Sequence, residues 1–204
     1  MGIRILTICG LPSCGKTTVG MRLATELRVD FLRESAECLI DAGYSPGAHA
    51  SEDFDRKILE LELSRDSNLL SSERNCIVET WHIGNYSYCL ARNSPVANRY
   101  GRILTSASKA FDIGCLFLRI SPQISAYRCR EKSWPGRGDI KKAGFHTFEF
   151  LEKLDLCFRQ VLKEFPIRTF VIDSSKPITE VLLEAKTSAA RFFRPLEPQL
   201  FVPH

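Results

Sequence analysis

An eight-residue segment near the start of the chain places the strongest constraint on its fold. The segment Gly10-Leu11-Pro12-Ser13-Cys14-Gly15-Lys16-Thr17 matches the phosphate-binding pattern G-x-x-x-x-G-K-[ST]. A strand-like apolar run at 3–9 precedes it, and apolar residues at helical spacing follow over 16–28. Backbone N–H groups of such a strand-to-helix loop point inward and bind phosphate oxygens. The pattern therefore predicts a binding site for a nucleoside triphosphate.

Two side chains of this loop are expected to act on the phosphates directly. Lys16 would reach the β- and γ-phosphates, and the Thr17 hydroxyl would be a ligand of Mg²⁺. ATP and Mg²⁺ are therefore the predicted cofactors, and Thr18 would complete the phosphate site. The alternative interpretation is an ordinary glycine-rich turn between a strand and a helix.

Strand-like and helical segments alternate along the 204 residues. The strand-like runs are 3–9, 29–33, 75–79, 114–120 and 168–173, and helical periodicity covers 16–28, 35–42, 53–73, 84–92, 96–110, 122–131, 146–164 and 178–193. This alternation predicts an α/β fold in which helices cover both faces of a parallel sheet. The length suits one domain over 1–193, followed by a proline-rich tail over 194–204.

The net charge of +4 hides an uneven distribution. Residues 26–79 carry 13 acidic side chains, whereas residues 91–142 carry 11 lysines and arginines against three acids. A basic second half suits a segment that faces phosphates. It permits a nucleic-acid partner without predicting one.

The eight cysteines form no C-x-x-C pair and have no zinc-site spacing with histidine. No signal-like region precedes the first strand, and no apolar run approaches about 18 residues. These features predict a cytoplasmic protein with reduced thiols and no membrane association. Cys14, close to a helix N-terminus and to Lys16, is expected to have a lowered pKa and to be reactive.

Two glutamates at strand ends are candidates for catalysis. Glu79 ends the apolar run Cys76-Ile77-Val78, a position from which it would reach Mg²⁺ or a water bound to it. Glu34 follows the run at 29–33 and would accept the proton of an acceptor hydroxyl or hold that hydroxyl in line. Alternatively, both are solvated surface carboxylates, and Glu34 opens a helix whose dipole favours its charge.

Four cations lie within ten residues beside a glycine-rich stretch: Arg128, Arg130, Lys132 and Arg137. The guanidinium group matches phosphate oxygens in shape, and one arginine near a γ-phosphate raises the transfer rate strongly. We therefore expect an arginine-bearing lid over about 128–144, with catalytic Arg128 and Arg130 and with Arg128 and Arg137 on the nucleotide. A solvated cationic helix face is the alternative.

The segment after the third strand-like run, Thr80-Trp81-His82-Ile83-Gly84-Asn85-Tyr86-Ser87-Tyr88, is rich in aromatic and amide groups. Such groups suit a flat acceptor, which they would bind by stacking and hydrogen bonding. Trp81 and Tyr86 are the candidate acceptor contacts, together with Arg92 and Arg99 further on. The aromatic residues could equally belong to the core.

In their order, these motifs resemble the small P-loop nucleoside and nucleotide kinases. The shared order is the phosphate loop, Glu34, Glu79, the lid, and a last strand that ends in Val171-Ile172-Asp173-Ser174-Ser175. The middle of the chain resembles ribosylnicotinamide-kinase-type ATPases, and residues 150–181 resemble thymidylate kinase.

This resemblance implies a P-loop fold with strand order 2-3-1-4-5, in which Ser174 and Ser175 belong to the loop that passes the adenine. It also implies that ATP donates its γ-phosphoryl group to a hydroxyl or phosphate of a nucleoside, a nucleotide or a similar small metabolite.

One position departs from the pattern of this family. Its third strand typically ends in Asp-Arg or Glu-Arg, whereas this chain has Glu79-Thr80, so Arg92 or Arg99 would have to supply the missing guanidinium. A non-nucleoside acceptor, such as an antibiotic or a polynucleotide end, stays open, as does nucleotide binding without turnover. The absence of an Asn-Lys-x-Asp motif argues against a GTPase-like switch. The sequence does not decide between a monomer and a homodimer.

Overall fold

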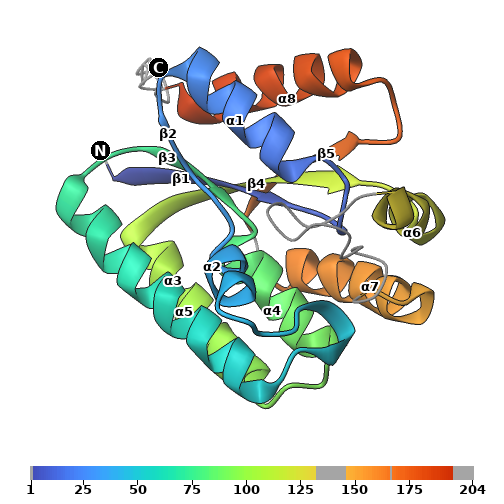
Figure 1. Ribbon diagram of the computed structural model, residues 1–204. Coiled ribbons are helices and arrows are strands. Elements are labelled where there is room, and N and C mark those ends of the chain that lie inside the picture. Colours follow the sequence, from blue (N-terminus) through green and yellow to red (C-terminus); the bar gives the residue numbers. More distant parts are fainter. Residues whose placement is uncertain (1, 132–145, 166, 195–204) are drawn as a thin grey trace, which may run out of the picture.

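A five-stranded parallel sheet forms the centre of the protein in the computed structural model, which describes residues 2–131, 146–165 and 167–194 (Figure 1). The strand order is β2-β3-β1-β4-β5. The predicted α/β P-loop fold and its strand order are therefore confirmed. The strands are β1 (Ile3–Cys9), β2 (Asp30–Leu32), β3 (Cys76–Glu79), β4 (Phe111–Arg119) and β5 (Arg168–Asp173).

Helices cover both faces of this sheet (Figure 1). One face carries α1 (Lys16–Leu27) and α8 (Ile178–Phe193). The opposite face carries α3 (Glu52–Ser72), α4 (Trp81–Ala91), α5 (Ala97–Ala110) and α7 (Phe148–Glu164). Three short elements follow the carboxyl ends of β2 and β4: α2 (Ala36–Asp41), the 3-10 helix η1 (Gly47–His49) and α6 (Pro122–Glu131).

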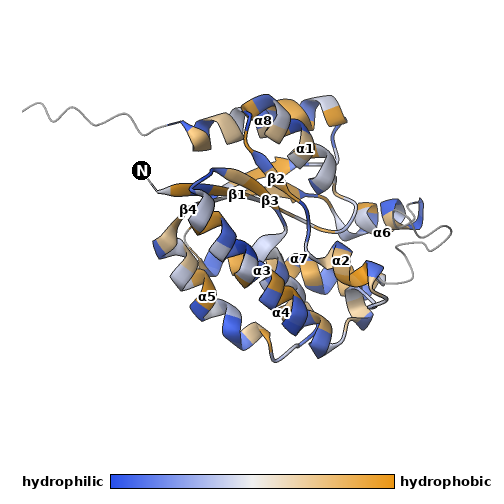
Figure 2. Ribbon diagram, turned by 60° about the vertical axis from the view of Figure 1, so that its left-hand side comes forward, coloured by the Kyte–Doolittle hydropathy of each residue, from blue (hydrophilic) through white to orange (hydrophobic). Residues whose placement is uncertain are grey.

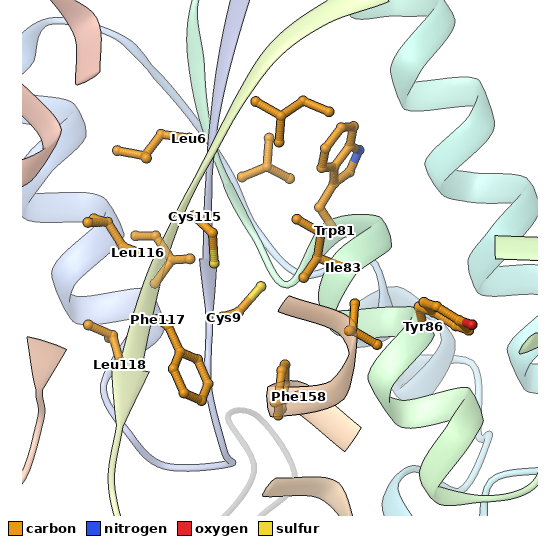
Figure 3. Packing of buried hydrophobic residues seen from close by; sticks show 14 of the residues in the cluster. Leu6, Cys9, Trp81, Ile83, Tyr86, Cys115, Leu116, Phe117, Leu118 and Phe158 are labelled. Carbon is orange, nitrogen blue, oxygen red and sulfur yellow. The ribbon is translucent and has the colours of Figure 1, made fainter. Parts of the chain in front are cut away.

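Side chains of the central strands alternate between the two helical layers (Figure 3). Leu6 of β1 and Leu116 of β4 point toward α1 and α8, whereas Cys9 and Cys115 point toward α4 and α7. The two thiols are fully buried and act there as small apolar groups. All eight cysteines are free, as their spacing predicts.

The outer helices are amphipathic (Figure 2). In α8, Val181, Ala185, Ala189 and Phe192 are buried at helical spacing, while the exposed side is mostly polar and also carries Leu183. In the part of the chain that the structure describes, no helix combines the length and apolar composition of a membrane span.

Two elements begin three residues earlier than the sequence-based expectation, and the other boundaries agree to within two residues. β4 begins at Phe111 rather than at residue 114, because it pairs along the whole of β1 from Ile3 onward. Helix α4 begins at Trp81 rather than at residue 84. Thr80 and Trp81 have φ values of 67° and 43°, which turn the chain from β3 into the helix without an intervening loop.

Part of the predicted lid falls outside the described residues. This part is residues 132–144, with Lys132 and Arg137. Most of the predicted tail, residues 195–204, also lies outside the described residues. The single-domain assignment over 1–193 stays a prediction.

The contact between β4 and α8 gives a test of the packing. A Cβ atom added to Gly114 would lie 2.7 Å from Cε2 of Phe192 and 3.2 Å from Cδ1 of Leu6. We expect Gly114→Ala to lower the free energy of unfolding by about 1–3 kcal/mol, because a filled core must shift to admit the methyl group. Urea denaturation measures this change.

Gly101 in α5 is the matched control, because nothing lies within 4 Å of a Cβ built there. Gly101→Ala should raise the free energy of unfolding by up to about 1 kcal/mol, because alanine is the better helix former. Equal effects of the two substitutions would contradict the described packing.

Candidate active site

A cavity of about 280 Å³ opens at the carboxyl ends of the strands. The phosphate loop and the start of α1 form one side of it, and Glu79 at the end of β3 lies beside them. Side chains from the segment between β2 and α2, and from α2, α3 and α4, form the other side. The cavity thus joins the predicted phosphate site to a space in which a second molecule could bind.

The phosphate loop depends on glycine where it meets β4. Gly10 has a φ of 147°, and a Cβ atom added to it would lie 2.4 Å from the carbonyl oxygen of Leu118. Gly15, at the start of α1, has a φ of 102°. Both conformations are costly for residues with a side chain, so the two glycines of the motif are required by the backbone.

Hydrogen bonds from α6 and from the segment after β5 hold the phosphate loop from outside. The Ser125 hydroxyl donates to the carbonyl of Pro12 at 2.7 Å, and the Ser174 hydroxyl donates to the carbonyl of Cys14. Arg128 donates to the carbonyl of Ser174 at 3.1 Å. The structure therefore places Arg128 and Ser174 next to the phosphate loop, where the sequence-based interpretation expects nucleotide contacts.

Other residues of the predicted nucleotide site lie further out. Ser175 donates its hydroxyl to Asp173, in a turn that follows β5. Arg130 is exposed on α6 and does not line the cavity. Its predicted catalytic role therefore has no support from the described geometry.

Lys16 is buried inside the phosphate loop. Its Nζ atom donates to the carbonyls of Gly10 and Leu11 at 3.3 and 3.5 Å. Burial acts to lower the pKa of this lysine, but acidic groups around it, Glu34 and Glu79 among them, raise the pKa above the ordinary value. The ammonium group therefore stays charged at neutral pH.

Among the described residues, Thr17 and Glu79 form a contact that suits a metal ion. The Thr17 hydroxyl lies 2.9 and 3.0 Å from the two carboxylate oxygens of Glu79, which is 3% exposed. Burial, and then the negative charge of Glu34, raise the pKa of Glu79 to about 7. A hydroxyl and a carboxylate beside a phosphate site fit Mg²⁺, which keeps several waters and takes few protein oxygens.

Helix α4 presents one face to the cavity. Asn85, Tyr88, Cys89 and Arg92 line it at a spacing of i, i+3, i+4 and i+7. Glu34, in the segment between β2 and α2, lines the same cavity. The helical spacing of these four residues was the sequence signal that could have identified the acceptor side.

The two aromatic residues predicted to contact an acceptor are corrected by the structure. Trp81 is 0% exposed and donates its indole N–H to Asp66 at 2.9 Å, so no ring face is open for stacking. Tyr86 lies about a quarter of a turn from Asn85 and stacks on Tyr100, with 5.7 Å between ring centroids. Both rings belong to the core (Figure 3).

Of the two arginines predicted to contact an acceptor, Arg92 lines the cavity and Arg99 does not. Arg99 is exposed on α5 and does not line the cavity. Arg92 does line it, in a buried ion pair with Asp55 of α3, in which the side chains are 7% and 2% exposed. Arg92 also donates to the carbonyl of Gly47 at 3.1 Å and lies over the ring of Tyr88, 5.4 Å from its centroid. Sequence reasoning missed Asp55.

The expected reactivity of Cys14 is also corrected. Its side chain is 1% exposed, packed beneath the phosphate loop against the end of β4. Burial raises the pKa of this thiol, and the nearby charge of Lys16 does not reverse that effect. A neutral, buried thiol is a packing group rather than a nucleophile.

Comparison with known proteins yields structural likeness alone. No protein-family model and no curated protein sequence matches the chain. Deoxyadenosine kinase from M. mycoides with bound dATP superposes with a TM-score of 0.61 at 15% identity, over 92% of this chain and 99% of that one. The YorR protein from Bacillus subtilis, in complex with phosphorylated GDP, gives 0.56 at 18% identity, over 93% and 94%.

The NadR protein in complex with NR gives a TM-score of 0.67 at 15% identity, over 96% of this chain and 52% of that one. The fold is that of the small nucleoside kinase-like P-loop proteins. At these identities the likeness establishes the P-loop fold, and the chemistry has to be argued from the site.

The buried ion pair gives a stability test. Arg92→Leu should lower the free energy of unfolding by about 3–5 kcal/mol, because it leaves the Asp55 carboxylate buried without a counter-ion. The double variant Asp55→Leu/Arg92→Leu should be less destabilised than Arg92→Leu alone. If the stability loss of the double variant, measured by urea unfolding, equals the sum of the losses of the two single variants, the described pairing is contradicted.

The raised pKa of Glu79 predicts that the metal-free protein loses stability as the pH rises from about 4.5 to about 7. In that window the unfolded chain ionises this carboxyl while the folded protein keeps it protonated. The free energy of unfolding of Glu79→Gln should therefore rise relative to that of the wild type by on the order of 2 kcal/mol as the pH goes from about 5 to about 8. Urea unfolding in EDTA measures the stability difference between the two proteins at each pH. A difference that does not change with pH would overturn the expectation.

Proposed function

We propose that this protein is an ATP-dependent kinase, which transfers the γ-phosphoryl group to a nucleoside, a nucleotide or a similar small metabolite. One observation carries the proposal: Lys16, Thr17, Glu79 and Glu34 line a single cavity that extends past the phosphate loop into a second, partly apolar space. The structural neighbours support the proposal, since one of those named above is a deoxyadenosine kinase with bound dATP.

The donor half of the site would hold ATP through the phosphate loop. Backbone N–H groups of the loop and the Lys16 ammonium would bind the β- and γ-phosphates. Thr17 and Glu79 would hold Mg²⁺, which neutralises charge on the transferred group. Arg128 and Ser174 lie beside the loop and would contact the nucleotide next to the phosphates.

The acceptor half would orient the group that receives phosphate. Glu34 lines this cavity, where its carboxylate would accept the acceptor's proton or align its hydroxyl. Asn85 and the Tyr88 hydroxyl offer hydrogen bonds, while Phe54 and Ile58 of α3 give an apolar wall. Phosphoryl transfer needs this positioning more than it needs covalent chemistry.

Single-turnover transfer from radiolabelled ATP to a panel of nucleosides and nucleotides tests the proposal. Lys16→Ala and Glu79→Ala should each lower the rate at least about 100-fold, because each removes charge stabilisation of the transferred group. Glu34→Gln should lower the rate by about 10²–10⁴ while ATP still binds.

Glu60→Gln is the matched control, because Glu60 is exposed on α3 and is not among the residues that line the cavity. Its rate should equal that of the wild type. Magnesium-dependent ATP binding without transfer to any acceptor would instead indicate a nucleotide-binding protein without turnover.

A further inference from the structure

The charged groups on the acceptor side of the cavity are predominantly acidic. Glu34, Glu37 and Asp55 line this part, against the two arginines Arg33 and Arg92. Lys16 is the remaining cation of the described lining, and it lies inside the phosphate loop. Among the described residues of this side, Arg33 and Arg92 therefore carry the permanent positive charges that a bound phosphate could use.

Each nitrogen of the Arg92 guanidinium already has a hydrogen-bond partner. Its Nε atom lies 3.3 Å from Oδ2 of Asp55, and a second nitrogen binds Oδ1 of the same carboxylate. The third nitrogen donates to the carbonyl of Gly47, and the guanidinium plane lies over Tyr88. Since both charged groups are buried, releasing Arg92 to a phosphate would leave Asp55 without a counter-ion.

Arg33 is engaged as well. Its guanidinium lies 3.0 Å from a carboxylate oxygen of Glu37, one helical turn along, and its side chain is 54% exposed. The carbonyl of Arg33 accepts from Arg65 at 2.8 Å, which ties this part of the backbone to α3. A phosphate on the acceptor side would have to compete with Glu37 for this arginine.

Glu34 lines the cavity and interacts electrostatically with both Lys16 and Glu79. No ion pair joins it to a basic side chain in the described part of the chain, and its charge contributes to the raised pKa of Glu79. A phosphate dianion brought next to Glu34 would meet like charge in a partly buried space. A hydroxyl would donate a hydrogen bond to the same carboxylate.

From this charge arrangement we infer that the acceptor is an unphosphorylated, nucleoside-type molecule, and that phosphate is transferred to its hydroxyl rather than to a monophosphate. The inference rests on the proposed function, which allows either a nucleoside or a nucleotide as the acceptor, and it selects the nucleoside. In the transfer, the hydroxyl oxygen bonds to the γ-phosphorus, the bond to the β–γ bridging oxygen breaks, and ADP leaves. The hydroxyl proton passes to Glu34.

Matched pairs of acceptors test the inference. Each common ribonucleoside and deoxyribonucleoside is compared with its own 5′-monophosphate in kcat/KM for transfer from ATP. The preferred nucleoside should exceed its monophosphate by at least about tenfold, a difference of about 1.4 kcal/mol. Preference for the monophosphate overturns the inference and leaves the proposed function standing. Transfer to neither member of any pair, or failure to bind Mg·ATP, would instead overturn the proposed function.

The charge of Glu34 supplies a second readout, which does not depend on turnover. Binding of the monophosphate is measured by calorimetry with the donor site saturated by a non-hydrolysable ATP analogue and Mg²⁺. Glu34→Gln should tighten this binding several-fold, because like charge is removed, although the same variant slows transfer to the nucleoside. Glu60→Gln should leave binding unchanged. Weaker monophosphate binding by Glu34→Gln overturns the inference.

Discussion

Direct backbone contact between the phosphate loop and the end of β4 determines the geometry of the site. Gly10 approaches the carbonyl of Leu118 so closely that no side chain fits between them. β1 pairs on its other edge with β3, in a register that places Ile8 opposite Glu79. The loop that begins after β1 and the carboxylate that ends β3 are therefore neighbours by sheet pairing. The contact between Thr17 and Glu79 follows from this register.

The acceptor side is assembled from segments that are distant in the sequence. The buried pair of Asp55 and Arg92 joins α3 to the end of α4, and Arg92 also fixes the backbone at Gly47. Replacing buried ion pairs by apolar residues often leaves stability unchanged or improves it. The value of this pair therefore lies in geometry, since one guanidinium positions a carboxylate, a loop carbonyl and the ring of Tyr88 together.

The sequence was sufficient for the features that are encoded locally. A short stretch of sequence is enough to recognise each of them: the phosphate motif, the strand-helix alternation and the two strand-end glutamates. The acceptor contacts were predicted poorly, because Trp81 and Tyr86 are aromatic residues of the kind that bind flat ligands and also of the kind that fill cores. Only tertiary packing separates Tyr86, stacked on Tyr100, from Tyr88 in the cavity. The ion pair of Asp55 and Arg92 spans 37 positions and has no local signature.

The hydrogen bond from Ser125 to the loop carbonyl of Pro12 has a consequence for the exchange of parts between proteins of this fold. Helix α6 contains no glycine-rich motif, yet it contacts the phosphate loop through Ser125 and, by way of Ser174, through Arg128. A chimaera that imports a foreign α6 would thereby change how the phosphate loop is held, even with every residue of the motif intact. The transferable unit is the loop together with the helix that braces it.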